Sequence, residues 1–319
     1  MAYVMPFERP VAELEAKLDS LRKLDRGDSP ALHQEIEELA AQVIHLRDEL
    51  YANPTPWMRV QISRHPERPK TQDYVANLFT DVVELHGDRA YGDDEAMLTA
   101  LATFAGRRCM VLGHRKGSNT KENVKRNFGS PHPEGFRKAM RGMELADRFG
   151  LPVVTFLDTQ GAYPGIEAEE RGQAWAIAEC LATLSTLRVP VVVFGIGEGG
   201  SGGALAIGFG DRLVMLENAY YSVVSPEGCA SILYKDAERA EDVAGCLKMN
   251  ASDLVDLGIA DEIVAEPPGG AQREPAVVYA GVGDALGRAL ADLCPRDPAA
   301  LVADRYARIR ALGVFEESV

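Results

Sequence analysis

The fold of this chain is decided by the stretch at residues 189–204, VPVVVFGIGEGGSGGA. It begins with a β-branched run that has no polar alternation, as expected for a strand buried on both faces of a sheet. An echo of this run, LPVVTF, stands earlier in the chain at residues 151–156. Each copy leads into a glycine-containing loop and then into a predicted helix. The echo therefore predicts repeated strand–loop–helix units and an α/β fold.

Further elements are predicted on both sides of this pair. Strands are expected at residues 97–104, 108–112, 213–216 and 221–224. Helices are expected at residues 134–149, 168–187, 276–293 and 299–311. Ser225 followed by Pro226 is typical of a helix start, with a serine N-cap and a proline in the first turn.

The N-terminal part of the chain predicts a helical hairpin. Apolar residues recur at steps of three and four over residues 11–24 and 32–50, and a turn is expected between them at 25–30. The apolar stripes of both helices need a cover, which we expect from the main domain or from another subunit. The predicted organisation is a hairpin for subunit contacts (1–52), a main domain (53–295) and a C-terminal helical tail (296–319).

Composition excludes several classes of protein. The chain has 319 residues and a formal net charge of −14, so it is a poor general binder of nucleic acid. No apolar run reaches the ~18 residues of a membrane span, and residues 1–10 lack a secretory signal pattern. The five cysteines include no CxxC pair, which argues against a cysteine zinc site. We therefore expect a cytoplasmic protein without membrane contacts and without a metal in this chain.

The glycine-rich loop after the second strand is the main candidate for chemistry. Glycines at a strand-to-helix turn leave backbone N–H groups open to a ligand, and the helix start adds unsatisfied donors. Such a turn suits an anion or a developing oxyanion. The first copy ends in a similar loop at residues 158–165. Two donor loops after adjacent strands are expected to face one cavity.

Two other interpretations of the same glycines stay open. Gly195, Gly197 and Gly200 match a dinucleotide-binding fingerprint, although a stretch so rich in glycine matches many such patterns. Ser201, between Gly199 and Gly203, matches the nucleophile elbow of serine hydrolases. All six histidines precede Ser201, against the order of the α/β-hydrolases, but other triad orders exist.

One segment runs against the acidic composition. Residues 115–141 carry eight lysines and arginines against only Glu122 and Glu134. The surplus predicts either an anionic ligand or partner, or a solvated basic face.

The ordered motifs closely resemble the α subunits of bacterial acetyl-CoA carboxylase carboxyltransferases. The matching stretches are GHRKG (113–117), TKE (120–122), RNFG (126–129), PEGFRKA (133–139), GAYPG (161–165), AEERGQ (168–173), EGGSGGALAIG (198–208) and SPEGCA (225–230). The resemblance covers nearly the whole chain. Gln160 stands where some members of the family have proline.

The resemblance implies a crotonase-like (ClpP/crotonase) fold, a spiral of ββα units with an N-terminal helical hairpin. It implies transfer of a carboxyl group from carboxybiotin to acetyl-CoA, which gives malonyl-CoA and is the first committed step of fatty acid synthesis. The expected partners are a zinc-ribbon β subunit in an α2β2 assembly and a separate biotin carboxyl carrier protein. Alternatives are another acyl-CoA carboxyltransferase or decarboxylase, for example for propionyl-CoA, or a serine hydrolase using Ser201.

The resemblance also implies roles for particular residues. The expected backbone donors to the biotin ureido oxygen are Gly202 and Gly203, helped by Gly161 and Ala162. Biotin supplies the base, so the protein needs none. Further substrate contacts are expected from Gly199, Gly200, Ser201, Tyr163 and Gly165. The basic segment is expected to meet CoA phosphates or the partner's acidic surface, through Lys116, Lys121 and Arg126.

Overall fold

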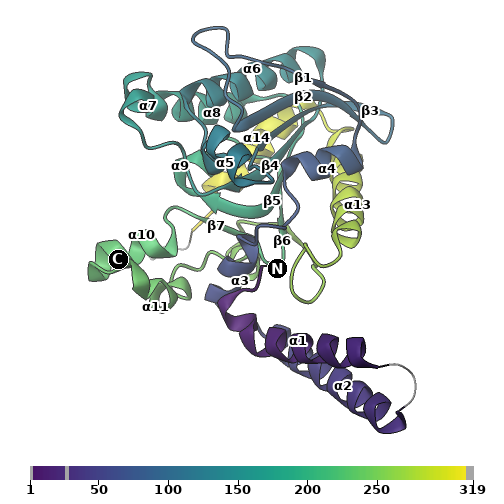
Figure 1. Ribbon diagram of the computed structural model, residues 1–319. Coiled ribbons are helices and arrows are strands. Elements are labelled where there is room, and N and C mark those ends of the chain that lie inside the picture. Colours follow the sequence, from purple (N-terminus) through teal and green to yellow (C-terminus); the bar gives the residue numbers. More distant parts are fainter. Residues whose placement is uncertain (1–2, 26–28, 314–319) are drawn as a thin grey trace, which may run out of the picture.

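The computed structural model describes residues 3–25 and 29–313, and an eight-stranded sheet lies at its centre (Figure 1). The strand order is β1-β2-β3-β4-β5-β6-β8, with β7 paired to β5. The first three strands are antiparallel, and the pairs from β3 onward are parallel. The strands are β1 Thr80–Glu84, β2 Met97–Phe104, β3 Arg107–His114, β4 Val153–Thr159, β5 Val191–Gly200, β6 Arg212–Leu216, β7 Tyr220–Ser222 and β8 Glu262–Val264.

Helices cover both faces of this sheet. α6 and α8 pack together on one face, and α4 and α13 lie on the other (Figure 1). The helices are η1 Pro6–Glu8, α1 Arg9–Leu24, α2 Pro30–Ala52, α3 Pro56–Ser63, α4 Thr71–Leu78, α5 Thr120–Lys125, η2 Asn127–Gly129, α6 Pro133–Phe149, α7 Ile166–Glu170, α8 Gln173–Thr186, α9 Ser201–Leu205, α10 Pro226–Tyr234, η3 Ala237–Arg239, α11 Ala240–Ala244, α12 Ala251–Asp256, α13 Pro275–Leu293 and α14 Pro298–Arg310. None of the helices in the described ranges is long and apolar enough to span a membrane.

The two echoed runs form adjacent parallel strands, as predicted. Val153 of β4 pairs with Val191 of β5, and every residue of both strands is buried. Phe156 and Phe194 stack across the pair with ring centroids 5.6 Å apart. Burial on both faces explains why neither run alternates with polar residues.

Three expectations are corrected by the structure. The helix expected at 168–187 is two helices, because Gly172 takes a φ of 80° between α7 and α8, outside helical space. The strand expected at 221–224 is β7 at Tyr220–Ser222. The stripes of the N-terminal hairpin cover each other in large part, with Val11 and Leu39 in their common core, where cover from the main domain or another subunit was expected.

The hairpin extends away from the main body (Figure 1). Its base is tied to the body by Glu8, which is buried and accepts a hydrogen bond from Arg273 at 3.0 Å. Ser29 caps α2 as its side chain accepts the N–H of Leu32. Residues 26–28 of the predicted turn lie outside the described residues.

The C-terminal helix α14 is fixed to the main sheet. Leu301 belongs to the main hydrophobic core. Arg305 is fully buried and pairs with Asp211, which follows the glycine-rich segment. Residues 314–319, the end of the predicted tail, lie outside the described residues.

Candidate active site

The two glycine loops touch each other at the ends of β4 and β5. A methyl group added at Gly203 would lie 2.3 Å from the amide nitrogen of Ala162 and 2.5 Å from the carbonyl carbon of Gly161. One added at Gly200 would lie 2.1 Å from the carbonyl oxygen of Gln160. These are backbone atoms that cannot move aside cheaply, so only glycine permits this approach. The two loops therefore lie against each other, as expected of loops that follow adjacent strands.

Three amides of these loops are the candidates for binding a ligand. Among residues 3–25 and 29–313, the backbone N–H of Ala162 has no acceptor, and Gly202 and Gly203 lie in the first turn of α9, where N–H groups have no partner within the helix. The expected donor Gly161 is different, because its N–H already donates to Thr159 Oγ1 at 3.0 Å. In the structure this amide is therefore already bonded within its own loop. Gly202 also lines an open cavity of about 260 Å³ together with Leu205.

The remaining residues of the loops shape their backbone. Gly199 lies so close to β7 that an added methyl group would be 2.8 Å from the carbonyl oxygen of Tyr220. Tyr163 stacks at a tilt on His132, with ring centroids 4.1 Å apart, and its ring lies over Gly165. Sequence reasoning missed His132.

The geometry disfavours the two other interpretations of the glycine loop. Ser201 is exposed and has a φ of 52°, as a nucleophile elbow would. However, no histidine of the described chain is hydrogen-bonded to Ser201. His114 instead accepts the N–H of Asp158 at Nδ1 (3.3 Å), so Nε2 donates to the carbonyl of Gly203 (3.1 Å). The dinucleotide interpretation needs a long helix, and α9 spans only Ser201–Leu205.

The buried His114 is expected to make the free energy of unfolding depend on pH in the acid range. Burial lowers its pKa to about 4, whereas an unfolded histidine titrates near 6.5. Between these values the unfolded chain binds the extra proton, so we expect this histidine to reduce the free energy of unfolding as pH falls from about 6.5 to 4. The contribution is about 1.4 kcal/mol per pH unit in that window. Denaturant unfolding at several pH values should show a shallower acid dependence for His114→Gln, and equal slopes for both proteins would contradict it.

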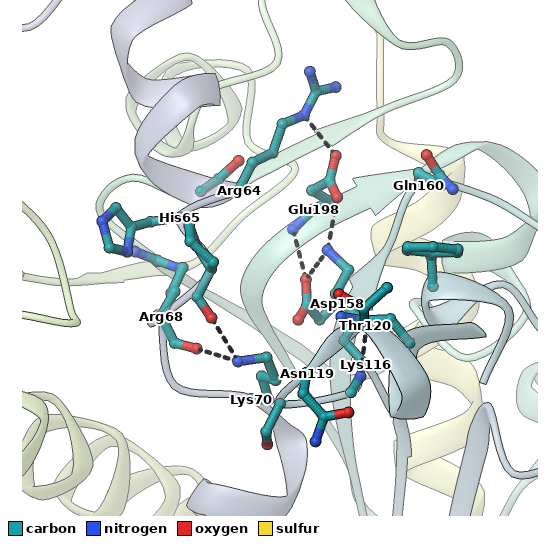
Figure 2. A pocket seen from close by; sticks show the side chains of 16 residues that line it. Arg64, His65, Arg68, Lys70, Lys116, Asn119, Thr120, Asp158, Gln160 and Glu198 are labelled. Atoms are coloured by element: carbon teal, nitrogen blue, oxygen red, sulfur yellow. Dashed lines mark hydrogen bonds and ion pairs between the residues drawn. The ribbon is translucent and has the colours of Figure 1, made fainter. Parts of the chain in front are cut away.

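A cleft of about 380 Å³ lies beside the loops (Figure 2). Its floor is a cluster of buried charges. Lys116 contacts Asp158 at 2.8 Å and Glu198 at 2.6 Å, and Arg64 contacts the other oxygen of Glu198 at 2.7 Å. Burial alone would raise the pKa of Glu198, but Lys116 and Arg64 outweigh it and lower the pKa to about 2. Sequence reasoning missed Arg64, which arrives from the end of α3.

The basic segment is mostly neutralised within the chain. Its cations pair with an acidic stretch before it, through Arg115–Glu84, Lys125–Glu95, Arg137–Asp88 and Lys138–Asp93. Lys116 has two carboxylates as partners, and Arg126 donates to the carbonyl of Lys116 at 3.0 Å. Lys121 is exposed. Of the three expected phosphate ligands, Lys116 and Arg126 lie in contact but each already has a carboxylate partner, and most of the segment's positive charge is neutralised by ion pairs.

The geometry can be compared with known proteins. The family described as "Acetyl co-enzyme A carboxylase carboxyltransferase-like" matches residues 4–313. The chain belongs to this carboxyltransferase family. An α subunit of acetyl-coenzyme A carboxylase carboxyl transferase from Thermus thermophilus is 51% identical over 313 residues, which cover 98% of this chain and 99% of the relative. The α subunit from Sorangium cellulosum is 52% identical over 314 residues, with coverages of 98% and 99%.

Solved structures of other carboxyltransferases share the fold of this family member. The transcarboxylase 12S structure has a TM-score of 0.58 at 19% identity, over 71% of this chain and 42% of the other. The β subunit of geranyl-CoA carboxylase from P. aeruginosa has a TM-score of 0.56 at 16% identity, over 79% and 46%. This chain therefore spans less than half of either of these proteins. The expected crotonase-like fold is confirmed.

Proposed function

We propose that this chain is the α subunit of an acetyl-CoA carboxylase carboxyltransferase, the subunit that receives carboxybiotin and supports transfer of its carboxyl group to acetyl-CoA. The contact between the two glycine loops carries this proposal, together with the unbonded amide of Ala162 and the two amides in the first turn of α9. The names of relatives that match it over nearly their full length support it.

The loops would act on the charge that develops on biotin. When carboxybiotin loses CO₂, negative charge moves onto the ureido ring and its oxygen. The N–H groups of Ala162, Gly202 and Gly203 would donate to this oxygen, and each such donor stabilises a transition state by roughly 2.7–4 kcal/mol. Biotin, when bound, would supply the base that removes a proton from the methyl group of acetyl-CoA, and the enolate of acetyl-CoA would then attack CO₂ to give malonyl-CoA. No side-chain base is required, which fits the binding of both His114 nitrogens to the backbone.

The proposed assembly follows from the family. We infer a zinc-ribbon β subunit in an α2β2 complex, biotin on a separate carrier protein, a cytoplasmic location, and no metal in this chain. We assign residues 1–52 to subunit contacts, because the hairpin extends from the body and leaves Leu24 and Ile44 exposed (Figure 1). Residues 53–295 would form the catalytic domain, and 296–319 a C-terminal helical segment. Lys121 is kept as a contact for CoA phosphates or for the partner.

The partner requirement is the first test. The isolated chain is expected to lack biotin-dependent decarboxylation of malonyl-CoA, and addition of the zinc-ribbon subunit should raise the rate by at least about 100-fold, since the enolate side of the site is then completed. Release of acetyl-CoA measures this. Full activity of the chain alone would indicate a self-sufficient crotonase-fold enzyme, and a faster reaction with methylmalonyl-CoA would favour propionyl-CoA as the acceptor.

A further inference from the structure

The ladder between β4 and β5 is interrupted directly before both glycine loops. Regular pairing holds up to Leu157 and Gly195, and it resumes only at Thr159 and Gly199. Asp158 therefore stands alone opposite three residues of β5. Backbone hydrogen bonds no longer fix the spacing of the two strands at this point. Some other contact has to set how the first loop lies against the second.

Lys116 provides that contact. Its Nζ lies 2.8 Å from Asp158 Oδ1 and 2.6 Å from Glu198 Oε2, so it joins the two sides of the interruption (Figure 2). Asp158 Oδ1 also accepts the backbone N–H of Glu198 at 3.2 Å. The Lys116 side chain is only 16% exposed, and those of Asp158 and Glu198 are 7% and 9% exposed. Solvent screens these contacts little.

The surroundings hold Lys116 in one place. The turn of η2 packs on its stem, and a methyl group added at Gly129 would lie 2.8 Å from Lys116 Cγ. Asn127 and Phe128 in this turn have φ values of 46° and 54°, in left-handed space that asparagine tolerates but a bulky residue such as phenylalanine rarely adopts. Strained backbone of this kind persists where the surrounding structure over-determines it, commonly at functional sites.

Burying this cluster of charges costs folding free energy, which favours a functional role for it. Buried charges lose hydration, and well-packed apolar side chains are often as stable or more stable in the same place. Burial opposes the charged form of Lys116, but Asp158 and Glu198 outweigh this and raise its pKa above the ordinary value. The lysine is therefore a permanent cation with both carboxylates already paired to it.

We propose that Lys116 is a positioning residue for carboxyl transfer, which sets the spacing of the two glycine loops by linking Asp158 to Glu198 across the interrupted ladder. This role rests on the proposed function, and it replaces the expectation that Lys116 binds a phosphate. Lys116 acts through its two carboxylates. Because the loops bind charge that forms only during the reaction, its loss lowers kcat and leaves the KM for acetyl-CoA unchanged.

The test uses variants in complex with the zinc-ribbon subunit. Lys116→Met is expected to lower kcat by about 100-fold, the scale of a 1 Å misplacement, and to lower the Tm because Asp158 loses its cation. The double variant Lys116→Met with Asp158→Asn removes both charges and keeps an acceptor for the Glu198 N–H. It should recover the Tm but keep the low kcat. Lys116→Arg should recover part of kcat. Lys125→Met, at an exposed lysine of the same segment, is the control and should match the wild type.

Recovery of kcat together with the Tm in the double variant would overturn the proposal, because Lys116 would then only neutralise Asp158. A wild-type kcat in Lys116→Met, or a raised KM for acetyl-CoA as its main effect, would also overturn it. Failure of the proposed function would be seen differently, because the wild-type complex itself would not decarboxylate malonyl-CoA. The proposed role of Lys116 would then be excluded as well.

Discussion

Replacing Gly203 with alanine is expected to lower the kcat of carboxyl transfer by about 100-fold or more. The new methyl group would lie 2.3 Å from Ala162 N and 2.5 Å from Gly161 C. Both are backbone atoms, so the two loops have to separate, and the amides of Ala162 and Gly203 can no longer donate to one oxygen. Steady-state rates of the complex measure the loss, and circular dichroism shows whether the fold is retained.

Gly287 offers a matched control for this substitution. It lies inside α13, and a methyl group added there would have nothing within 4 Å. Gly287→Ala should leave kcat unchanged and raise the free energy of unfolding by about 0.5–1 kcal/mol, the usual gain for alanine inside a helix. A Gly203→Ala enzyme as active as Gly287→Ala would remove the glycine loops from the reaction.

The pattern of the sequence was sufficient to predict the centre of the fold. The two β-branched runs predicted adjacent parallel strands, because strands buried on both faces are apolar throughout and do not alternate between apolar and polar residues. The glycines predicted loops whose backbone N–H groups a ligand can approach, since a stretch so rich in glycine loses much conformational entropy on folding; the close contact between the two loops is visible only in the structure. The break at Gly172 was missed because the flanking residues are good helix formers and only a φ of 80° reveals it.

Side-chain partners were the part that could not be predicted. Lys116 was interpreted as a phosphate ligand because its neighbours in the sequence are basic, yet its partners Asp158 and Glu198 arrive from the ends of two later strands. The same holds for Arg64, which reaches Glu198 from α3. A count of charges along a segment cannot show which of them pair with residues elsewhere in the sheet. How far such pairs neutralise the segment can be seen only in the structure.

The largest loss of stability is expected from Arg305→Met in α14. The guanidinium of Arg305 pairs with Asp211 at 2.8 Å and donates to the carbonyls of Leu184, Leu187 and Val189 at 2.8–3.0 Å. Methionine fills the apolar part of this space but removes the donors of three carbonyls and leaves the buried Asp211 carboxylate without its cation, with the Val191 N–H still donating to it at 2.7 Å. Removing one partner of a buried ion pair costs about 3–5 kcal/mol, so the free energy of unfolding from denaturant titration should fall by that amount.

These contacts tie α14 to the segment between α8 and β5. The glycine loops lie at the other end of β5, so Arg305→Met should lower the stability of the fold before it changes the loops. Arg310 at the exposed end of the same helix is the control, because Arg310→Met removes a cation of the same kind from the surface and should change stability by less than about 0.5 kcal/mol. At low denaturant, Arg305→Met should therefore keep most of its kcat while unfolding earlier than the control. Equal unfolding midpoints for the two variants would mean that α14 is not held by its buried arginine.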